Sequence, residues 1–162
     1  MLWLLSEHQQ MMQVHAESSY PQEACGLLIG RSLTDQIDGL DIQVLEVQPT
    51  LNAWSPEVGE WIGGGTGKFD RFWIDPAEIL RVMQEARSRG LEIVGVYHSH
   101  PDHAAIPSEC DRQMAWSQYA YIILSVMQGQ MAACQGWSLN AAHQFEPLTL
   151  QWVAEEEVGE MR

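Results

Sequence analysis

The sequence predicts a single α/β (α+β) domain. The chain has 162 residues, which fits one domain and is long enough to bury roughly 70% of the surface that the unfolded chain exposes. Apolar runs of strand length are mixed with two or three helical segments, and no internal repeat or interdomain linker divides them. We therefore expect one domain over residues 1–154, followed by an acidic tail at 155–162.

The first third of the chain predicts a helix and two strands. Ser6 and Gln9 resemble a capping box, so a helix is expected over 6–18. Residues 25–30 form a short apolar run between glycines, which is typical of a buried strand. Residues 41–48 alternate between apolar and polar side chains, and the break in phase at Leu45 indicates a β-bulge.

The middle of the chain contains the strongest helix signal. Residues 49–68 have no periodicity and are predicted to form a long loop, and 72–74 a short strand. Asp75 and Pro76 then provide a cap and a first-turn proline, and Gly90 ends the helix. Its apolar stripe is expected to consist of Ile79, Leu80, Met83 and Ala86.

The remaining elements flank residues 98–111, the stretch that carries the candidate site. Residues 93–97 are continuously apolar, as in a central strand, and 108–116 are typical of a second helix. Three further strands with short connections, which favour antiparallel pairing, are expected at 120–126, 131–137 and 148–153.

Composition excludes several classes of function. The chain carries 22 acidic and 8 basic residues, a net charge of −14, and this field repels nucleic acid and anionic lipid surfaces. No window approaches 18 apolar residues, and the apolar N-terminal run is too short for a signal segment. An odd number of widely spaced cysteines (Cys25, Cys110 and Cys134) argues against a disulfide framework. A cytoplasmic protein with no nucleic-acid or membrane partner is expected.

The candidate site begins at the end of the predicted central strand. His98 and His100 face the same side because strand side chains alternate, with Cα atoms roughly 6.5–7 Å apart at a rise of ~3.3 Å per residue. Two imidazoles at this spacing can share one zinc ion, and Asp111 in the next helix can add a carboxylate. Three protein ligands leave a fourth position for water, as in catalytic zinc sites.

The chemistry of such a site needs two more groups. Zinc lowers the pKa of its water to about 7 and polarises a carbonyl. A carboxylate that does not bind the metal must carry the proton to the leaving amine. The oxyanion needs a hydrogen-bond donor, and Ser108 is placed to offer one.

Each part of the motif also has a simpler interpretation. His98 and His100 could be exposed strand histidines, and Ser108 with Asp111 could be only a capping box. The combination at this separation favours metal binding, and Ser108 can serve as both cap and donor. His103 in the same loop is expected to be exposed, and Cys25 and Cys110 are expected to be small buried residues.

The motif resembles a known family. His98-x-His100, seven residues, Ser108, two residues and Asp111 match the signature His-x-His-x7-Ser-x2-Asp of the JAMM (MPN+) metalloproteases at every defined position. Glu23, in Pro-Gln-Glu-Ala-Cys-Gly, looks like the glutamate at the edge of the family's first core strand. Over roughly residues 5–137 the chain is similar to the bacterial stand-alone members, including the segments 71–76 and 93–101.

The resemblance implies a cytidine-deaminase-like fold, a curved mixed β-sheet flanked by helices. It also implies one Zn²⁺ held by His98, His100 and Asp111, with Glu23 as general acid/base and Ser108 stabilising the oxyanion. Family members cleave peptide or isopeptide bonds at the C-terminal tail of ubiquitin-like proteins. Bacterial stand-alone relatives act on sulfur-carrier proteins, for example by removing a C-terminal cysteine. A zinc-dependent metallopeptidase with such a protein substrate is the expected function.

Two other functions remain as alternatives. A non-catalytic MPN-type scaffold would be expected to lack some metal ligands, whereas this chain keeps all three. A zinc nucleotide deaminase needs a Cys-x-x-Cys pair, which the sequence lacks. The Gly-rich stretch near 57–67 does not match a phosphate-binding loop, since Phe69 replaces the required Ser or Thr. It is instead expected to be a mobile flap that, with Trp54 and Trp61, grips the substrate tail.

Overall fold

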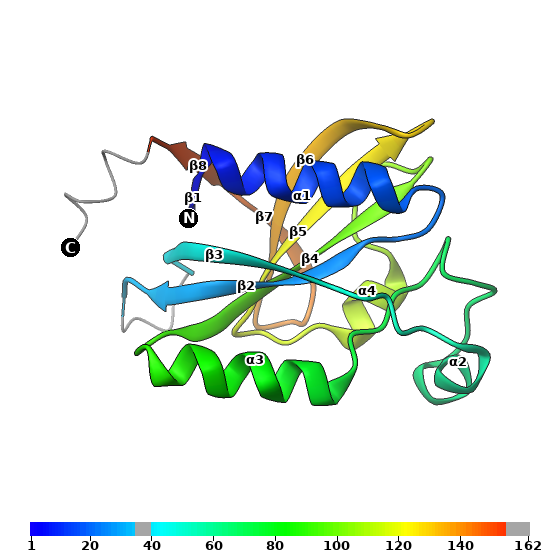
Figure 1. Cartoon of the computed structure of the whole chain (residues 1–162), viewed down its shortest axis with the longest axis horizontal. Helices are drawn as coiled ribbons and strands as arrows, with labels where there is room; N and C mark the ends of the chain where they lie inside the picture. The colour runs from blue at the N-terminus through cyan, green and yellow to red at the C-terminus, as the bar shows by residue number, and fades with distance from the viewer. Residues whose placement is uncertain (35–39, 155–162) are drawn as a thin grey trace.

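The computed structural model describes residues 1–34 and 40–154. Within these ranges the chain forms one eight-stranded sheet with helices on both sides (Figure 1). The strands are β1 (Leu2–Leu5), β2 (Cys25–Ser32), β3 (Ile42–Thr50), β4 (Glu92–Pro101), β5 (Ala120–Met127), β6 (Gln130–Leu139), β7 (Phe145–Leu148) and β8 (Leu150–Val153). The helices are α1 (Ser6–Ser19), α2 (Pro56–Ile62), α3 (Pro76–Ser88) and α4 (Glu109–Met114). The tail predicted at 155–162 lies outside the described residues.

The sheet is mixed, and β4 lies inside it. The strand order is β7-β6-β5-β4-β2-β3-β1-β8. β4 pairs antiparallel with β2 and parallel with β5, whereas β5, β6 and β7 form the antiparallel run expected at the C-terminal half. The predicted mixed α+β architecture is confirmed. Among the described residues, none of the helices combines the length and hydropathy needed to cross a bilayer.

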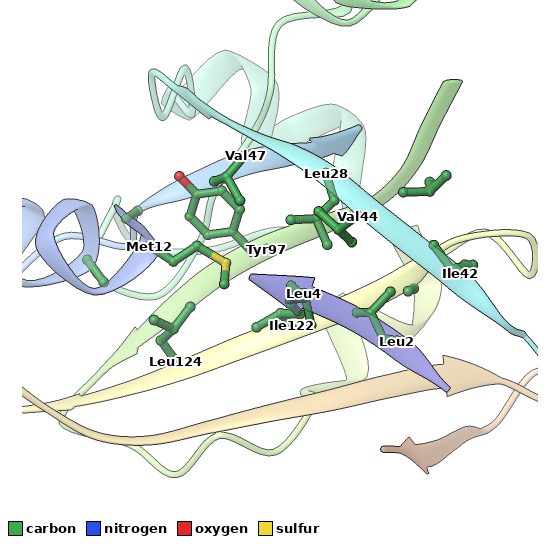
Figure 2. Close-up of a cluster of buried hydrophobic side chains, with 14 of the residues drawn as sticks. Leu2, Leu4, Met12, Leu28, Ile42, Val44, Val47, Tyr97, Ile122 and Leu124 are labelled. Atoms are coloured by element: carbon green, nitrogen blue, oxygen red, sulfur yellow. The ribbon is translucent and has the colours of Figure 1, made fainter. Parts of the chain in front are cut away.

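One side of the sheet packs against α1 and forms the main hydrophobic core (Figure 2). Met12 and Ala16 of α1 lie against side chains from five strands: Leu2, Leu4, Leu28, Ile42, Val44, Val47, Tyr97, Ile122 and Leu124. Tyr97 is fully buried, and its hydroxyl lies 2.7 Å from Nδ1 of His15. This side therefore supplies much of the apolar burial that stabilises the domain.

The opposite side of the sheet is covered by α3 (Figure 1). The Asp75 side chain accepts a hydrogen bond from the Ala77 N–H at 2.8 Å, so the predicted helix start is confirmed. Val82 and Ala86 are buried against β2 and β4, whereas Leu80 is 53% exposed. The predicted apolar stripe was wrong at Leu80, because the buried face of α3 runs through Val82 instead.

Two β-bulges set which side chains face which layer. In the β2–β3 pair, Ile29 is opposite Glu46 and Gly30 is opposite Val44, so Leu45 is the extra residue. The bulge predicted at Leu45 is confirmed. A second bulge was not predicted: Val94 of β4 has no partner on β2.

The bulge at Val94 determines the face of the candidate site. Ile93, on the α3 side, packs with the smaller cluster, and Val94 packs with the main core. After this extra residue the alternation restarts, so Tyr97 faces α1 while His98 and His100 face the side of α3. A single inserted residue thus allows Ile93 and the two histidines to share one face.

The structure corrects the predictions for the beginning of the chain. Leu2–Leu5 forms a short strand, β1, which was not predicted. The first helix is confirmed, but its predicted Ser6–Gln9 capping box is wrong. The Leu5 N–H instead donates to Nδ1 of His8 at 3.2 Å.

The region predicted as a long loop contains a helix. Ser55 caps α2 by accepting a hydrogen bond from the Val58 N–H at 3.3 Å, and Gly63, with φ of 88°, ends it. Trp54 packs against Gly59, where a Cβ would approach its ring to 3.0 Å. The predicted loop over 49–68 is therefore wrong in part, because local capping and one buried tryptophan stabilise a short helix.

Two predicted strands also differ. Residues 72–74 join no sheet, since the backbone of Trp73 is hydrogen-bonded to the Asn52 side chain and the Ala53 N–H instead. The strand predicted over 148–153 is two strands, β7 and β8. They lie at opposite edges of the sheet, and β8 pairs parallel with β1.

Candidate metal centre

His98 and His100 lie at the end of β4 and point at one spot. Their Nε2 atoms are 3.0 Å apart, as the alternation of side chains along a strand allows. Both residues are buried, with His98 1% and His100 8% exposed. Exposed strand histidines, the simpler interpretation, are therefore excluded.

Asp111 reaches the two histidines from the first turn of α4. Its Oδ1 lies 3.3 Å from Nε2 of His98, and its Oδ2 lies 3.3 Å from Nε2 of His100. The Asp111 N–H also donates to Oγ of Ser108 at 3.1 Å, and the Ser108 N–H donates to Oδ2 of Asp111 at 2.7 Å. The capping box and the convergence on the histidines thus coexist, and one carboxylate takes part in both.

Glu23 approaches the same spot from the segment that precedes β2. It is 6% exposed, and a carboxylate oxygen lies within 4.8 Å of ring nitrogens of both His98 and His100. Ser99 of β4 fixes this segment, because its hydroxyl accepts a hydrogen bond from the Ala24 N–H at 2.8 Å. Four ionisable side chains from three separate segments therefore meet at the end of β4.

Neighbouring groups orient the imidazoles. Nδ1 of His100 lies 2.8 Å from the Ala104 carbonyl oxygen, so the ring carries its N–H at Nδ1. The lone pair of Nε2 is then free to bind a metal ion. The ring of Phe72 stacks on His98 with centroids 4.5 Å apart. Nδ1 of His98 has no hydrogen-bond partner among the described residues. One imidazole is thus held by a hydrogen bond and the other by an aromatic ring.

The spacing of these atoms fits a metal ion. Ligand atoms around a tetrahedral zinc with bonds of ~2.0–2.1 Å lie roughly 3.3 Å apart. The distances of 3.0 Å between the two imidazoles and 3.3 Å from each to the carboxylate of Asp111 are close to this value. Two nitrogens and a carboxylate also form a common donor set for catalytic zinc.

The electrostatics of the centre depend on burial and on the charges of the neighbours. Burial, followed by the charge of Asp111, raises the pKa of Glu23 to about 9. Burial alone would raise the pKa of Asp111, but the charge of His98 and hydrogen bonds from both histidines lower it. Burial would lower the pKa of His100, and its hydrogen bond to Asp111 raises it. A cation at this spot would add positive charge where two buried carboxyl groups meet.

Ser108 and the histidine loop border a hollow next to the centre. This cavity of about 350 Å³ is lined by Glu23, Phe69, Asp70, Arg71, His100, His103, Ala104, Ile106 and Ser108. His103 is exposed, as expected. The carboxylate of Glu109, next to Cys110 in the sequence, pairs with Arg112. Among the described residues, Glu23 is thus the carboxylate that groups with the two histidines in addition to Asp111.

The cysteines do not contribute to this donor set. All three are free, and Cys25 is fully buried with its sulfur 3.5 Å from Oγ1 of Thr50. Cys110 is partly buried, so the expectation that it is buried holds only in part. Arg71 and Phe72, which line the site, were not predicted to be site residues. An aromatic and a basic residue just before a helix cap carry no spacing signal that links them to distant histidines.

Comparison with known proteins places the chain in a family. The model of the prokaryotic homologs of the JAB domain matches residues 5–140. A desampylase of Haloferax volcanii is 33% identical over 115 residues, which cover 70% of this chain and 68% of that protein. A probable TtuB-protein conjugate cleaving protease of Thermus thermophilus is 26% identical over 111 residues, covering 68% and 61%. The matched stretch thus spans about two thirds of each relative or slightly less.

Solved structures agree with this assignment. A protein of Desulfitobacterium hafniense is 28% identical with a TM-score of 0.71, over 96% of this chain and 97% of that one. A JAB1/MPN domain protein of Archaeoglobus fulgidus has a TM-score of 0.53 over 94% of this chain and 97% of that one, and at 17% identity it shows the shared fold alone. The chain is an α+β protein of the JAB/MPN fold. It belongs to the prokaryotic homologs of the JAB domain.

Proposed function

We propose that this chain is a zinc-dependent metallopeptidase that hydrolyses a peptide or isopeptide bond at the C-terminal tail of a ubiquitin-like or sulfur-carrier protein. The observation that carries the proposal is the convergence of His98, His100 and Asp111 within 3.3 Å of one another, with the buried carboxyl of Glu23 beside them. Relatives named desampylase and conjugate-cleaving protease support a hydrolase acting on such conjugates.

In this proposal His98, His100 and Asp111 hold the metal. When bound, zinc supplies Lewis-acid polarisation of the scissile carbonyl and an activated water. The hydrogen bond from His100 to Ala104 and the stacking of Phe72 on His98 keep both Nε2 atoms aimed at the site. Ordering these side chains in advance lowers the entropy that binding must otherwise overcome.

Glu23 carries the proton in the proposed reaction. It lies next to the ligands without being needed as one, so it is free to accept the proton of the attacking water and donate it to the leaving amine. Ser108 lines the adjacent hollow beside His100. Its Oγ accepts one hydrogen bond from the Asp111 N–H, which leaves its own hydrogen available for the oxyanion.

The broader assignment follows the same proposal. Residues 1–154 form one JAMM/MPN+ domain of cytidine-deaminase-like type with one zinc per chain, working in the cytoplasm. A non-catalytic scaffold of the same fold is the alternative. It is disfavoured because a scaffold has no need for two buried histidines and two buried or nearly buried carboxyl groups at one spot.

Two variants test the proposal. Glu23→Gln is expected to retain zinc and to lower the rate of tail cleavage by at least about 10²–10⁴-fold, the usual contribution of a positioned acid/base. His100→Ala is expected to lose both zinc and activity. Metal content by atomic emission and cleavage of a sulfur-carrier protein extended beyond its terminal glycines give the two readouts. Full activity in Glu23→Gln would move the base to another residue, and hydrolysis by a zinc-free His100→Ala protein would refute the metal site.

A further inference from the structure

A second, largely apolar cavity opens on the other side of the metal centre. It has a volume of about 320 Å³, roughly ten times the ~30 Å³ that one water occupies in the liquid. It lies between the sheet, α3 and α4. Most of its wall is apolar and includes Leu27, Phe72, Ile79, Val96, Met114 and Trp116. A cavity of this kind accepts a large apolar side chain.

One charged side chain in the cavity wall is neither a proposed metal ligand nor the proposed acid/base. Glu23, His98 and Asp111 line the cavity where it meets the centre. Arg71 is the remaining charged residue of the wall, and it also lines the hollow that contains Ser108. Arg71 therefore borders both hollows, and its charge acts on Glu23 to lower the pKa of that carboxyl.

Arg71 is held in place, but the hydrogen-bonding capacity of its guanidinium is not filled. Its Nη1 donates to the carbonyl oxygen of Asp70 at 2.6 Å, while its Nε is buried without a hydrogen-bond partner. Within the described ranges Arg71 forms no ion pair, and the carboxylate of the neighbouring Asp70 accepts hydrogen bonds from Thr66 and Gly67. Nε is buried and therefore closed to a ligand, whereas Nη2 has no hydrogen-bond partner among the described residues and is left to bind one.

The Gly-rich stretch explains why the arginine is fixed. Gly65 has a φ of 112°, and a Cβ there would lie 2.3 Å from Cγ of Arg71. Only glycine permits this close packing against the arginine stem. The loop thus packs against the stem of Arg71 and restricts its movement.

We propose that Arg71 and the apolar cavity form a subsite for a C-terminal residue with a free α-carboxylate and a large apolar side chain. The carboxylate binds the guanidinium, whose fork geometry suits it, and the side chain enters the cavity. This inference rests on the proposed function and specifies its leaving group. Water adds to the acyl carbon, the C–N bond breaks, and the carrier tail leaves as a carboxylate while the proton goes to the amine of the released amino acid.

The geometry favours this occupant over an isopeptide-linked lysine. A lysine inside a protein chain has no free α-carboxylate, so it would leave Nη2 of Arg71 without a partner. An apolar cavity and an unpaired cation beside one reaction centre together match a single terminal amino acid.

Binding to the metal-free full-length protein tests the subsite without catalysis. N-acetylphenylalanine, its amide and N-acetylglycine are titrated and followed by NMR shifts of the tryptophan indoles. The free acid is expected to bind about tenfold more tightly than the amide, and N-acetylglycine at least tenfold more weakly than N-acetylphenylalanine. Equal affinity for acid and amide, or for phenylalanine and glycine, overturns the proposal.

Variants assign the preference to Arg71. Arg71→Met is expected to bring the acid-to-amide affinity ratio close to one, and Arg71→Lys to leave a preference of a few fold. Arg87→Met, which removes an exposed arginine of α3, is the matched control and is expected to keep the full ratio. Thermal unfolding verifies that each variant is folded. A full ratio in both folded Arg71 variants refutes the role of this residue.

Cleavage by the zinc-loaded enzyme separates this proposal from the proposed function. A carrier tail is extended by phenylalanine, by phenylalanine amide or by an isopeptide-linked lysine. Faster release of phenylalanine than of its amide, by about tenfold in kcat/KM, supports the subsite. Cleavage of all three at equal rates overturns the subsite and leaves the peptidase proposal intact. Absence of any cleavage despite acid-selective binding refutes the peptidase proposal alone.

Discussion

The two sides of the sheet differ in how completely they are packed. On the α1 side, large apolar side chains from five strands are fully or almost fully buried (Figure 2). On the α3 side, the smaller cluster gives way to two hollows and to four buried or nearly buried ionisable groups. The same strand supplies both sides, since Tyr97 faces α1 while His98 and His100 face the hollows. The fold therefore places its main hydrophobic core on one side of the sheet and the candidate site on the other.

The largest expected effect tests the packed side. Leu124→Ala should lower the free energy of unfolding by about 2–5 kcal/mol, because the side chain is fully buried in the main core. Urea denaturation followed by circular dichroism measures the change. Tail cleavage per folded molecule should remain at the wild-type level, since Leu124 points away from the metal centre.

A matched leucine provides the control. Leu80→Ala, at a position that is 53% exposed on α3, should change the free energy of unfolding by no more than about 0.5 kcal/mol. If the two leucine variants were equally destabilised, the contrast between the two sides would fail.

Metal removal tests the α3 side of the sheet and is expected to have the next largest effect. At zinc concentrations of 100 times the Kd, binding stabilises the folded state by about 2.7 kcal/mol. At ~2–4 °C per kcal/mol for a chain of this size, chelation should lower the Tm by about 5–11 °C. Differential scanning calorimetry with and without chelator measures this shift. Leu124→Ala should keep the zinc-dependent shift, whereas His100→Ala should lose it.

The smallest expected effect is the pH dependence of stability due to His8, which lies on the α1 side. Burial lowers the pKa of His8 more strongly than the carboxylates of Glu7 and Glu46 raise it. The unfolded chain therefore binds the proton more readily, and stability is lost as the pH falls below the ordinary histidine value of ~6.5. The slope from this one residue is at most about 1.4 kcal/mol per pH unit.

A histidine variant isolates this contribution. When the pH is lowered from about 7.5 to about 5.5, roughly one unit to either side of the ordinary histidine pKa, His8→Asn should lose less stability than the wild type. Gln10→Asn, at an exposed position of α1, makes a similar change to the helix without removing a titrating group. An identical pH dependence in wild type and His8→Asn would show that His8 is not a source of acid sensitivity.

Elements with local signals could be predicted from the sequence. α3 has a cap, a first-turn proline and a terminating glycine, and the bulge at Leu45 disturbs a visible alternation. α2 has a similar start, Ser55 followed by Pro56, but the Gly-rich residues after it obscured the signal. β1 and β8 are four residues each and are stabilised by pairing with one another across the length of the chain, which no local pattern encodes.

The residues of the candidate site also differ in whether a local sequence signal identifies them. His98 and His100 could be placed together because two residues on one strand share a face, and Asp111 because a helix start follows the loop. Glu23 could be named only through resemblance, because it meets the histidines through strand pairing between β2 and β4. Arg71 could not be assigned a role, since its position beside both hollows and its lack of an ion pair are known only once the side chain and its neighbours are placed.

The unpaired Val94 on β4 has a consequence for reading related genes. If the residues of β4 paired with β2 without this bulge, alternation from Ile93 would turn Tyr97 toward α3 and both histidines toward α1. The phenol would then take the place of the imidazoles, yet every letter of the His-x-His motif would survive. A search by motif alone would count such a chain as an intact enzyme, so the irregular pairing of this strand is as informative about activity as the ligands themselves.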